Sequence, residues 1–125
     1  TGLPKESYDI IVCNHVLEHV DDFRLALKEV NRILSIGGRF ICSFPIDPQV
    51  ETLYEDSRIK TNEERLERFG QVDHKRVFGR NSSQLLKEAG FKVEKISGDT
   101  FPEEIFPIVG PADYDINVLF YCIKR

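Results

Sequence analysis

The sequence contains no methionine and no tryptophan, and only three cysteines in 125 residues. Three cysteines are too few for a disulfide framework, so Cys13, Cys42 and Cys122, each in an apolar run, are predicted to be free thiols that act as small hydrophobic residues. No apolar stretch approaches the roughly 20 residues that span a bilayer. A signal-peptide pattern is missing as well. We therefore expect a cytoplasmic protein without a membrane partner. Because the chain begins at Thr1 and contains no methionine, we also expect residues to precede Thr1 in a longer parent protein.

An excess of positive charge is also missing. The chain has 17 basic and 21 acidic residues, which gives a net charge of −4. Such a chain has no field that attracts nucleic acid, so no nucleic-acid partner is expected. Glycine is scarce at the start, where Gly2 is the only glycine before residue 37. A glycine-rich phosphate-binding loop is therefore excluded from the first 36 residues.

The apolar pattern predicts a single α/β domain over residues 1–125. Residues 45–80 are polar, and a long excursion between core elements is typical of a lid or insertion over a site. The predicted elements are, in order, a strand over 8–13, a helix from Asp21 or Asp22 that ends at Gly37-Gly38, a strand over 39–44, a helix over 61–69 with a Thr61–Glu64 capping box, a helix from Asn81 to Gly90, and strands over 91–96 and 116–123.

Three segments resemble, in the right order, motifs of class I S-adenosylmethionine-dependent methyltransferases. Residues 8–20 resemble the fourth sheet strand and its "vLEHv" turn, residues 31–40 the "R-x-L-x-x-G-G" passage into the fifth strand, and residues 89–93 the "aGF-x-v" step into the sixth. Residues 116–123 fit the antiparallel seventh strand. The resemblance implies a partial Rossmann-like sheet in the strand order 4-5-7-6, with the last strand antiparallel and helices on both faces.

The family's cofactor loop, G-x-G-x-G, and the acidic residue that binds the ribose have no counterpart here. The resemblance therefore implies the C-terminal half of a methyltransferase domain whose N-terminal half is absent. S-adenosylmethionine would be the cofactor of the parent protein, and this fragment would bind it weakly or not at all and be inactive alone. Strand 8–13 would form an unpaired sheet edge, so self-association through this strand is expected.

In open α/β sheets the ligand lies beyond the carboxyl ends of the strands. This rule and the resemblance point to a cofactor wall after the first strand, made of Cys13, Asn14, His15 and Val16. The alternative for Asn14 is a turn residue at the strand end.

Residues 70–79 resemble a "GQ-x-DH-x-R-x-x-G" stretch of bacterial methyltransferases of cell-surface glycan pathways, which implies a small-molecule or glycan-linked acceptor. His74 is a candidate general base, with His15 as a second catalytic candidate. Asp73 would orient His74, and Arg76 would hold an anionic substrate group by a two-pronged contact. The alternative is a solvated charged loop without a catalytic role.

The segment His15-Val16-Leu17-Glu18-His19 matches H-x-x-E-H, a zinc-hydrolase pattern that needs a regular helix. The motif follows a strand directly, so such a helix is not expected. Some methyltransferases resembling this chain hold a metal on an E-x-x-E-H turn, in which His15 would replace the first glutamate. We predict no metal, with a site on His15, Glu18, His19 and His74 as the alternative. A metal-dependent hydrolase and a non-catalytic module that dimerises through the sheet edge are the alternatives to methyl transfer.

Overall fold

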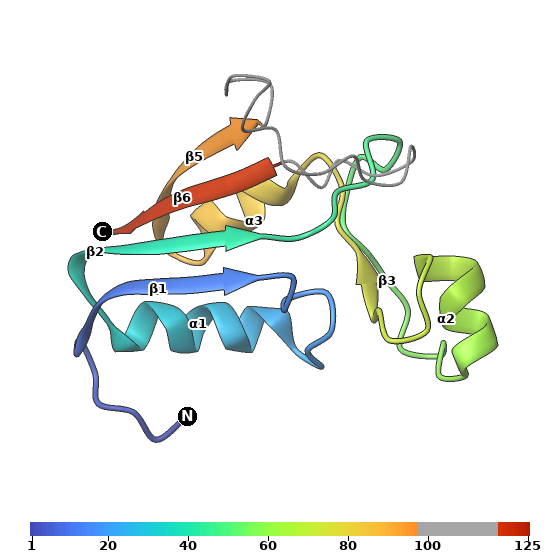
Figure 1. Cartoon of the computed structure of the whole chain (residues 1–125), viewed down its shortest axis with the longest axis horizontal. Coiled ribbons are helices and arrows are strands. Elements are labelled where there is room, and N and C mark those ends of the chain that lie inside the picture. Colours follow the sequence, from blue (N-terminus) through green and yellow to red (C-terminus); the bar gives the residue numbers. More distant parts are fainter. Residues whose placement is uncertain (98–117) are drawn as a thin grey trace, which may run out of the picture.

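The computed structural model describes residues 1–97 and 118–125, and within them a four-stranded sheet in the order β1-β2-β6-β5 (Figure 1). β1 and β2 are parallel, whereas β6 runs antiparallel to both of its neighbours. This confirms the predicted strand order and the antiparallel last strand. Residues 98–117, which include the first two residues of the strand predicted over 116–123, lie outside the described residues. The strands are β1 (Tyr8–Asn14), β2 (Leu34–Ser43), β5 (Phe91–Ser97) and β6 (Val118–Lys124).

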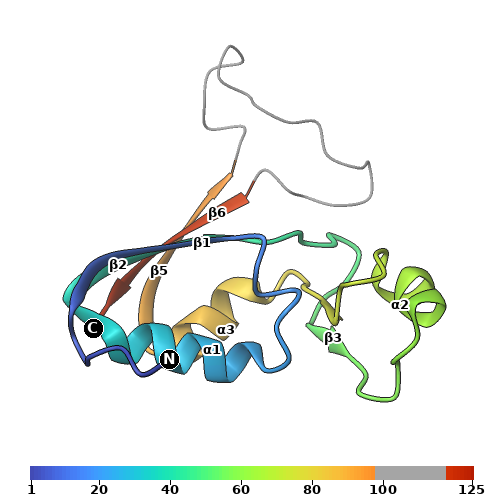
Figure 2. The same cartoon turned by 60° about the horizontal axis from the view of Figure 1, so that its bottom comes forward.

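Both helices that pack on this sheet, α1 (Phe23–Ile33) and α3 (Ser82–Glu88), lie on the same face (Figure 2). The prediction of helices on both faces is therefore not met in the described part of the chain. The reason lies in the strand order. The connections from β1 to β2 and from β2 to β5 step across the sheet in the same direction, and right-handed crossovers that step the same way place their helices on one face.

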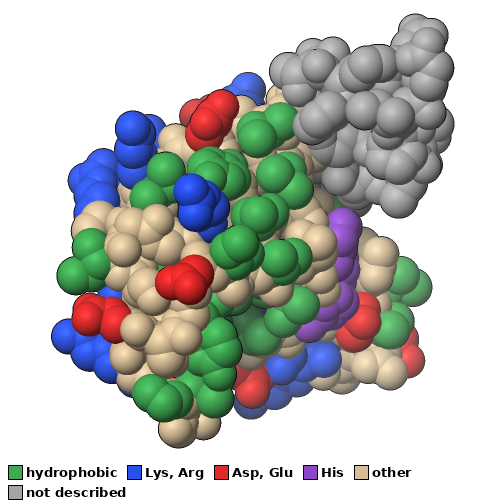
Figure 3. Space-filling model, turned by 60° about the vertical axis from the view of Figure 1, so that its left-hand side comes forward, with side chains coloured by type: hydrophobic (Ala, Val, Ile, Leu, Met, Phe, Trp, Pro, Cys, Tyr) green, Lys and Arg blue, Asp and Glu red, His purple; other side chains and the backbone are tan. Residues whose placement is uncertain are grey.

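The core fills the space between the sheet and these two helices. Its members include Phe23 and Leu27 of α1, Phe40 and Cys42 of β2, Leu86 of α3, and Phe120 and Cys122 of β6. On the opposite face, Ile10 and Val12 of β1 are 56% and 60% exposed. No helix covers this side of β1 in the described residues. Figure 3 shows hydrophobic side chains gathered on one side of the molecule, with histidine side chains at their margin.

α1 begins as predicted, because the Asp22 side chain accepts a hydrogen bond from the Leu25 backbone N–H at 2.9 Å. It ends at Ile33 rather than at Gly37-Gly38, since Leu34 already has an extended backbone. Gly37, with φ of +75°, instead lies within β2, where the register with β1 shifts. The glycine pair therefore serves a strand irregularity and does not terminate the helix.

The predicted insertion forms a small module beyond the carboxyl ends of β1 and β2 (Figure 1). It contains α2 (Asn62–Phe69) and an antiparallel pair of short strands, β3 (Tyr54–Glu55) and β4 (Arg76–Val77). The Thr61–Glu64 capping box is present, and Gly70 ends α2 in the left-handed conformation with φ of +81°. Among the described residues, the helices are too short and too polar to cross a membrane.

Candidate functional site

The carboxyl end of β1 is joined to that of β2 by polar contacts. The Ser43 hydroxyl donates to Asn14 Oδ1 at 3.1 Å, and the His15 backbone N–H donates to the Ser43 carbonyl at 2.8 Å. His15 takes a positive φ of 52°, which turns the chain sharply away from the strand. Burial raises the pKa of the Cys13 thiol, with the Glu18 charge acting in the same direction, so this thiol stays protonated at neutral pH.

These residues form the edge at which the cofactor wall was predicted. His15 and Val16 are exposed there, Val16 by 43%, while Cys13 is half-buried and Asn14 is held by Ser43. Asn14 thus also acts as the strand-end residue proposed as its alternative role. Its amide oxygen already accepts one hydrogen bond, and its remaining hydrogen-bonding capacity faces outward from an exposed position.

The H-x-x-E-H segment does not form a helix. Residues 15–22 consist of turns and bends, and α1 begins only at Phe23. The regular helix on which the zinc-hydrolase hypothesis depends is therefore missing from this segment. His15 Nδ1 lies 3.4 Å from Glu18 Oε1, and the Glu18 side chain points into the protein, with only 1% of the residue exposed.

The structure brings His74 to Glu18 and His19 from a distant part of the sequence. The Lys75 backbone N–H donates to the Glu18 carbonyl at 2.9 Å, which holds the insertion against the turn after β1. The rings of His19 and His74 meet edge to face with centroids 4.9 Å apart. Burial lowers the pKa of His74 and outweighs the opposing charge of Glu18. We define Glu18, His19 and His74 as the histidine–glutamate cluster.

Arg76 is buried, with 2% exposure, and each of its three guanidinium nitrogens donates a hydrogen bond to the protein. Nε donates to Glu55 Oε1 at 2.6 Å, and the two terminal nitrogens donate to the backbone carbonyls of Leu17 and Asp21. The predicted two-pronged contact with an anionic substrate group would therefore require the release of protein partners. Asp73, which was predicted to orient His74, is exposed, and its carboxylate lies 3.3 Å from Nδ1 of the neighbouring His19.

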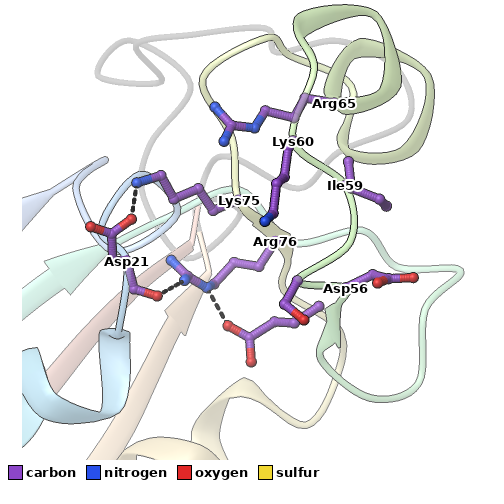
Figure 4. Close-up of a pocket in the computed structure, with 9 residues that line it drawn as sticks. Asp21, Asp56, Ile59, Lys60, Arg65, Lys75 and Arg76 are labelled. Carbon is purple, nitrogen blue, oxygen red and sulfur yellow. Dashed lines mark hydrogen bonds and ion pairs between the residues drawn. The ribbon is translucent and has the colours of Figure 1, made fainter.

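A hollow of about 540 Å³ opens beside Arg76 between the insertion and the turn after β1 (Figure 4). Lys60 and Arg65 reach it from the α2 side, while Lys75 and Asp21 pair on the opposite side. That pairing lowers the pKa of the Asp21 carboxyl, chiefly through the hydrogen bond from Lys75. The lining residues are Asp21, Glu55, Asp56, Ser57, Ile59, Lys60, Arg65, Lys75 and Arg76.

Sequence reasoning missed the two cations on the α2 side. Arg65 alternates with acidic residues on a polar helix, a pattern typical of a solvated face. In the structure, however, Arg65 Nε is buried and has no hydrogen-bond partner among the described residues. The sequence signal that could have identified Lys60 and Arg65 is their position at the start of a capped helix inside the predicted lid.

Residues 3–96 match the sequence model of a family described as the methyltransferase domain. The chain belongs to this family. Two curated methyltransferases also align with parts of it. The uncharacterized methyltransferase YcgJ of Bacillus subtilis is 45% identical over 38 residues, which are 30% of this chain and 15% of YcgJ. Demethylmenaquinone methyltransferase of Staphylococcus haemolyticus is 38% identical over an alignment 61 residues long, which covers 42% of this chain and 26% of that enzyme.

Solved structures with a similar fold match this chain over nearly its whole length. The YcgJ structure from Bacillus subtilis superposes with a TM-score of 0.62 at 20% identity, covering 100% of this chain and 67% of YcgJ. An S-adenosylmethionine-dependent methyltransferase from Mesorhizobium loti gives a TM-score of 0.59 at 19% identity, covering 98% of this chain and 64% of that protein. The chain thus spans about two thirds of these structures and about a quarter or less of the aligned curated relatives.

Proposed function

We propose that this chain is the acceptor-side half of an S-adenosylmethionine-dependent methyltransferase domain, and that its parent protein methylates a small-molecule or glycan-linked acceptor. The observation that carries the proposal is the family match over residues 3–96, together with a partial sheet whose parallel strands end in a polar edge. Relatives described as methyltransferases support the reaction class. The hollow between the insertion and the turn after β1 is of a size that suits a small acceptor.

The residues of this chain do not by themselves fit the cofactor. Cys13, Asn14, His15 and Val16 supply one wall, but the chain has no glycine-rich loop against which a nucleotide could lie closely. Gly2 is the only glycine before residue 37, and an added Cβ there would meet nothing within 4 Å. We therefore propose that preceding residues of the parent protein provide the cofactor loop, and that S-adenosylmethionine supplies the methyl group there.

On the acceptor side, this chain would orient the substrate and take its proton. Methyl transfer to a hydroxyl requires alignment and a base. His15 is the exposed histidine at the end of β1, and the buried Glu18 carboxylate beside its Nδ1 would hold the ring in position. His74 is almost fully buried, so it would act through the histidine–glutamate cluster rather than on the acceptor. Lys60 and Arg65 are better placed than Arg76 to hold an anionic group in the hollow.

Calorimetric titration of the 125-residue chain with S-adenosylmethionine tests the half-site. We expect no binding at micromolar concentrations, and micromolar affinity would overturn the assignment of the cofactor loop to preceding residues. A methyl-transfer assay with labelled cofactor on the longer protein tests the reaction class. There, His15→Gln should lower kcat by on the order of 100-fold, and Lys60→Gln should raise the KM of an anionic acceptor about tenfold. Lys28→Gln, on α1, is the matched control for Lys60→Gln.

A further inference from the structure

The Glu18 carboxylate is buried without a hydrogen bond. The residue is 1% exposed, and neither Oε1 nor Oε2 has a hydrogen-bond partner among the described residues. An ionised carboxylate is rarely buried in this way, because the lost hydration has to be replaced by hydrogen bonds, a counter-charge or a metal ion. The Glu18 carboxylate therefore has capacity for a partner besides the imidazoles that lie near it.

The surrounding imidazoles do not satisfy this need by hydrogen bonding. His19 Nε2 lies 3.8 Å from Glu18 Oε1, which is too long for a hydrogen bond. His15 Nδ1 lies closer to Glu18 Oε1, at 3.4 Å, but this contact is not a hydrogen bond either. One ligand atom from each member of the histidine–glutamate cluster nevertheless lies within 4.8 Å of the other two. The cluster thus gathers three donor atoms around a common point.

The imidazoles are oriented as metal ligands usually are. His19 Nδ1 lies 3.2 Å from the Asp73 carbonyl oxygen, which can only accept, so the proton belongs on Nδ1 and the lone pair on Nε2. Nε2 is the nitrogen on the Glu18 side. The Phe69 backbone likewise restrains the His74 ring by a hydrogen bond, and one ring nitrogen of His74 lies within 4.8 Å of the donor atoms of Glu18 and His19. Such outer hydrogen bonds fix the tautomer of metal-binding histidines.

We propose that Glu18, His19 and His74 bind a divalent transition-metal ion such as Zn²⁺. Two imidazoles and one carboxylate are a donor set that suits Zn²⁺ and similar ions, whereas Mg²⁺ prefers oxygen ligands throughout. Zinc bonds of about 2.0–2.1 Å place tetrahedral ligands about 3.4 Å apart, so the cluster would contract by roughly 1 Å on binding. The fourth position stays open to water. This inference concerns metal binding by the chain itself and stands apart from the proposed function.

The site also has a structural consequence. Glu18 and His19 belong to the turn after β1, and His74 belongs to the insertion. A shared metal ion would therefore link the insertion to the turn after β1. The H-x-x-E-H pattern pointed to His15 as a ligand, but the structure assigns the third ligand to His74, because His15 lies outside the group of mutually close donors.

Isothermal calorimetry on the untagged, chelator-treated 125-residue chain tests the proposal with Zn²⁺ as the probe. We expect one Zn²⁺ per chain and at least 100-fold weaker binding of Mg²⁺. Glu18→Gln and His74→Gln should each lower the Zn²⁺ affinity at least 100-fold. Glu88→Gln, a matched carboxylate change on α3, and Cys13→Ser, which removes the nearest thiol, should leave the affinity within about threefold. Circular dichroism checks that each variant is folded.

Two results would overturn the site: no stoichiometric Zn²⁺ binding by the unaltered chain, or equal affinity in the chain and in both ligand variants. Mg²⁺ binding as tight as that of Zn²⁺ would overturn the choice of ion. If a variant fails to fold, NMR of the histidine rings in the unaltered chain decides. Zn²⁺ should shift the His19 and His74 ring signals, and shifts confined to His15 would refute the assignment.

Discussion

Arg76 illustrates how one buried side chain joins two parts of this molecule. Its guanidinium sits on β4 of the insertion, yet it donates to the carbonyls of Leu17 and Asp21 in the turn after β1. Glu55 on β3 supplies the counter-charge, and the Phe23 ring lies 5.3 Å from the guanidinium carbon. A fork of five N–H donors can serve all of these partners at once, which lysine cannot do.

Replacement of Arg76 should therefore destabilise the fold. Arg76→Gln removes a buried charge and leaves the carbonyls of Leu17 and Asp21 without their donor, so we expect a loss of about 3 kcal/mol in the free energy of unfolding. Arg24→Gln is the matched control, because Arg24 also bonds Glu55, at 3.0 Å, but its side chain is 58% exposed. That change should cost less than about 1 kcal/mol. Denaturant unfolding followed by circular dichroism measures both, and equal losses would contradict the assigned role.

The pair of Glu6 and Lys124 predicts a pH dependence of stability. The hydrogen bond from buried Lys124 holds the pKa of Glu6 below its ordinary value of 4.5. The unfolded chain then binds more protons than the folded chain just below pH 4.5, so this stabilisation is full above that pH and is lost as the pH falls through the folded pKa.

Glu6→Gln should accordingly lower Tm at pH 7, and the difference from the unaltered chain should shrink below pH 4.5. The Lys5 side chain, which also pairs with Glu6, is 69% exposed, so Lys5→Gln should have a smaller effect on Tm. Scanning calorimetry between pH 3 and pH 7 provides the comparison. A Tm difference that stays constant over this range would show that the carboxylate charge is not responsible.

At the site, residue types were more predictable than their surroundings. His74 was named as a candidate from the resemblance of residues 70–79 and from the chemistry of an imidazole, and the structure places its ring against that of His19. The burial of Glu18 was not predictable, because a glutamate in a turn between a strand and a helix is normally exposed. The hydrogen-bond partners of Arg76 were also not predictable from the sequence, because two of them are backbone carbonyls, which any residue provides.

At the level of elements, local signals located the strands and most helix ends. The Asp22 cap and the capping box of α2 follow from side chains that bond neighbouring N–H groups, which is why the sequence predicts them well. Gly37-Gly38 misled, because glycine favours both helix ends and strand irregularities. The strand order already implies that α1 and α3 lie on the same face of the sheet, although the family resemblance implied helices on both faces.

Two backbone segments of the insertion pass close to each other at Gly79. A Cβ added to Gly79 would lie 2.5 Å from the Val50 carbonyl oxygen, where the Arg80 N–H also bonds at 2.9 Å. Gly79→Ala should cost about 2 kcal/mol, because backbone on both sides has to move. Hydrogen exchange at the Arg80 and Asn81 amides should speed up as well. Gly37→Ala is the control. Its Cβ meets nothing within 4 Å, so it should cost about 1 kcal/mol through its positive φ and leave those amides unchanged.

For the whole molecule, the dominant feature is a half-covered sheet. β1 is an edge strand, and its outward side chains Ile10 and Val12 adjoin the face that lacks a helix in the described residues. An exposed edge with apolar neighbours is prone to pair with another strand. The proposal of a half-domain would place further strands of the parent protein against this edge.

The isolated chain should therefore associate with a second copy through β1. Sedimentation velocity over a range of concentrations should reveal a reversible dimer. Val12→Lys places a charge on the edge strand and should weaken this association at least tenfold without loss of fold. Leu25→Lys is the matched control, because Leu25 is 63% exposed on α1, away from β1, and should leave the dimer intact. A strictly monomeric chain at high concentration, or equal weakening by both changes, would exclude β1 as the pairing surface.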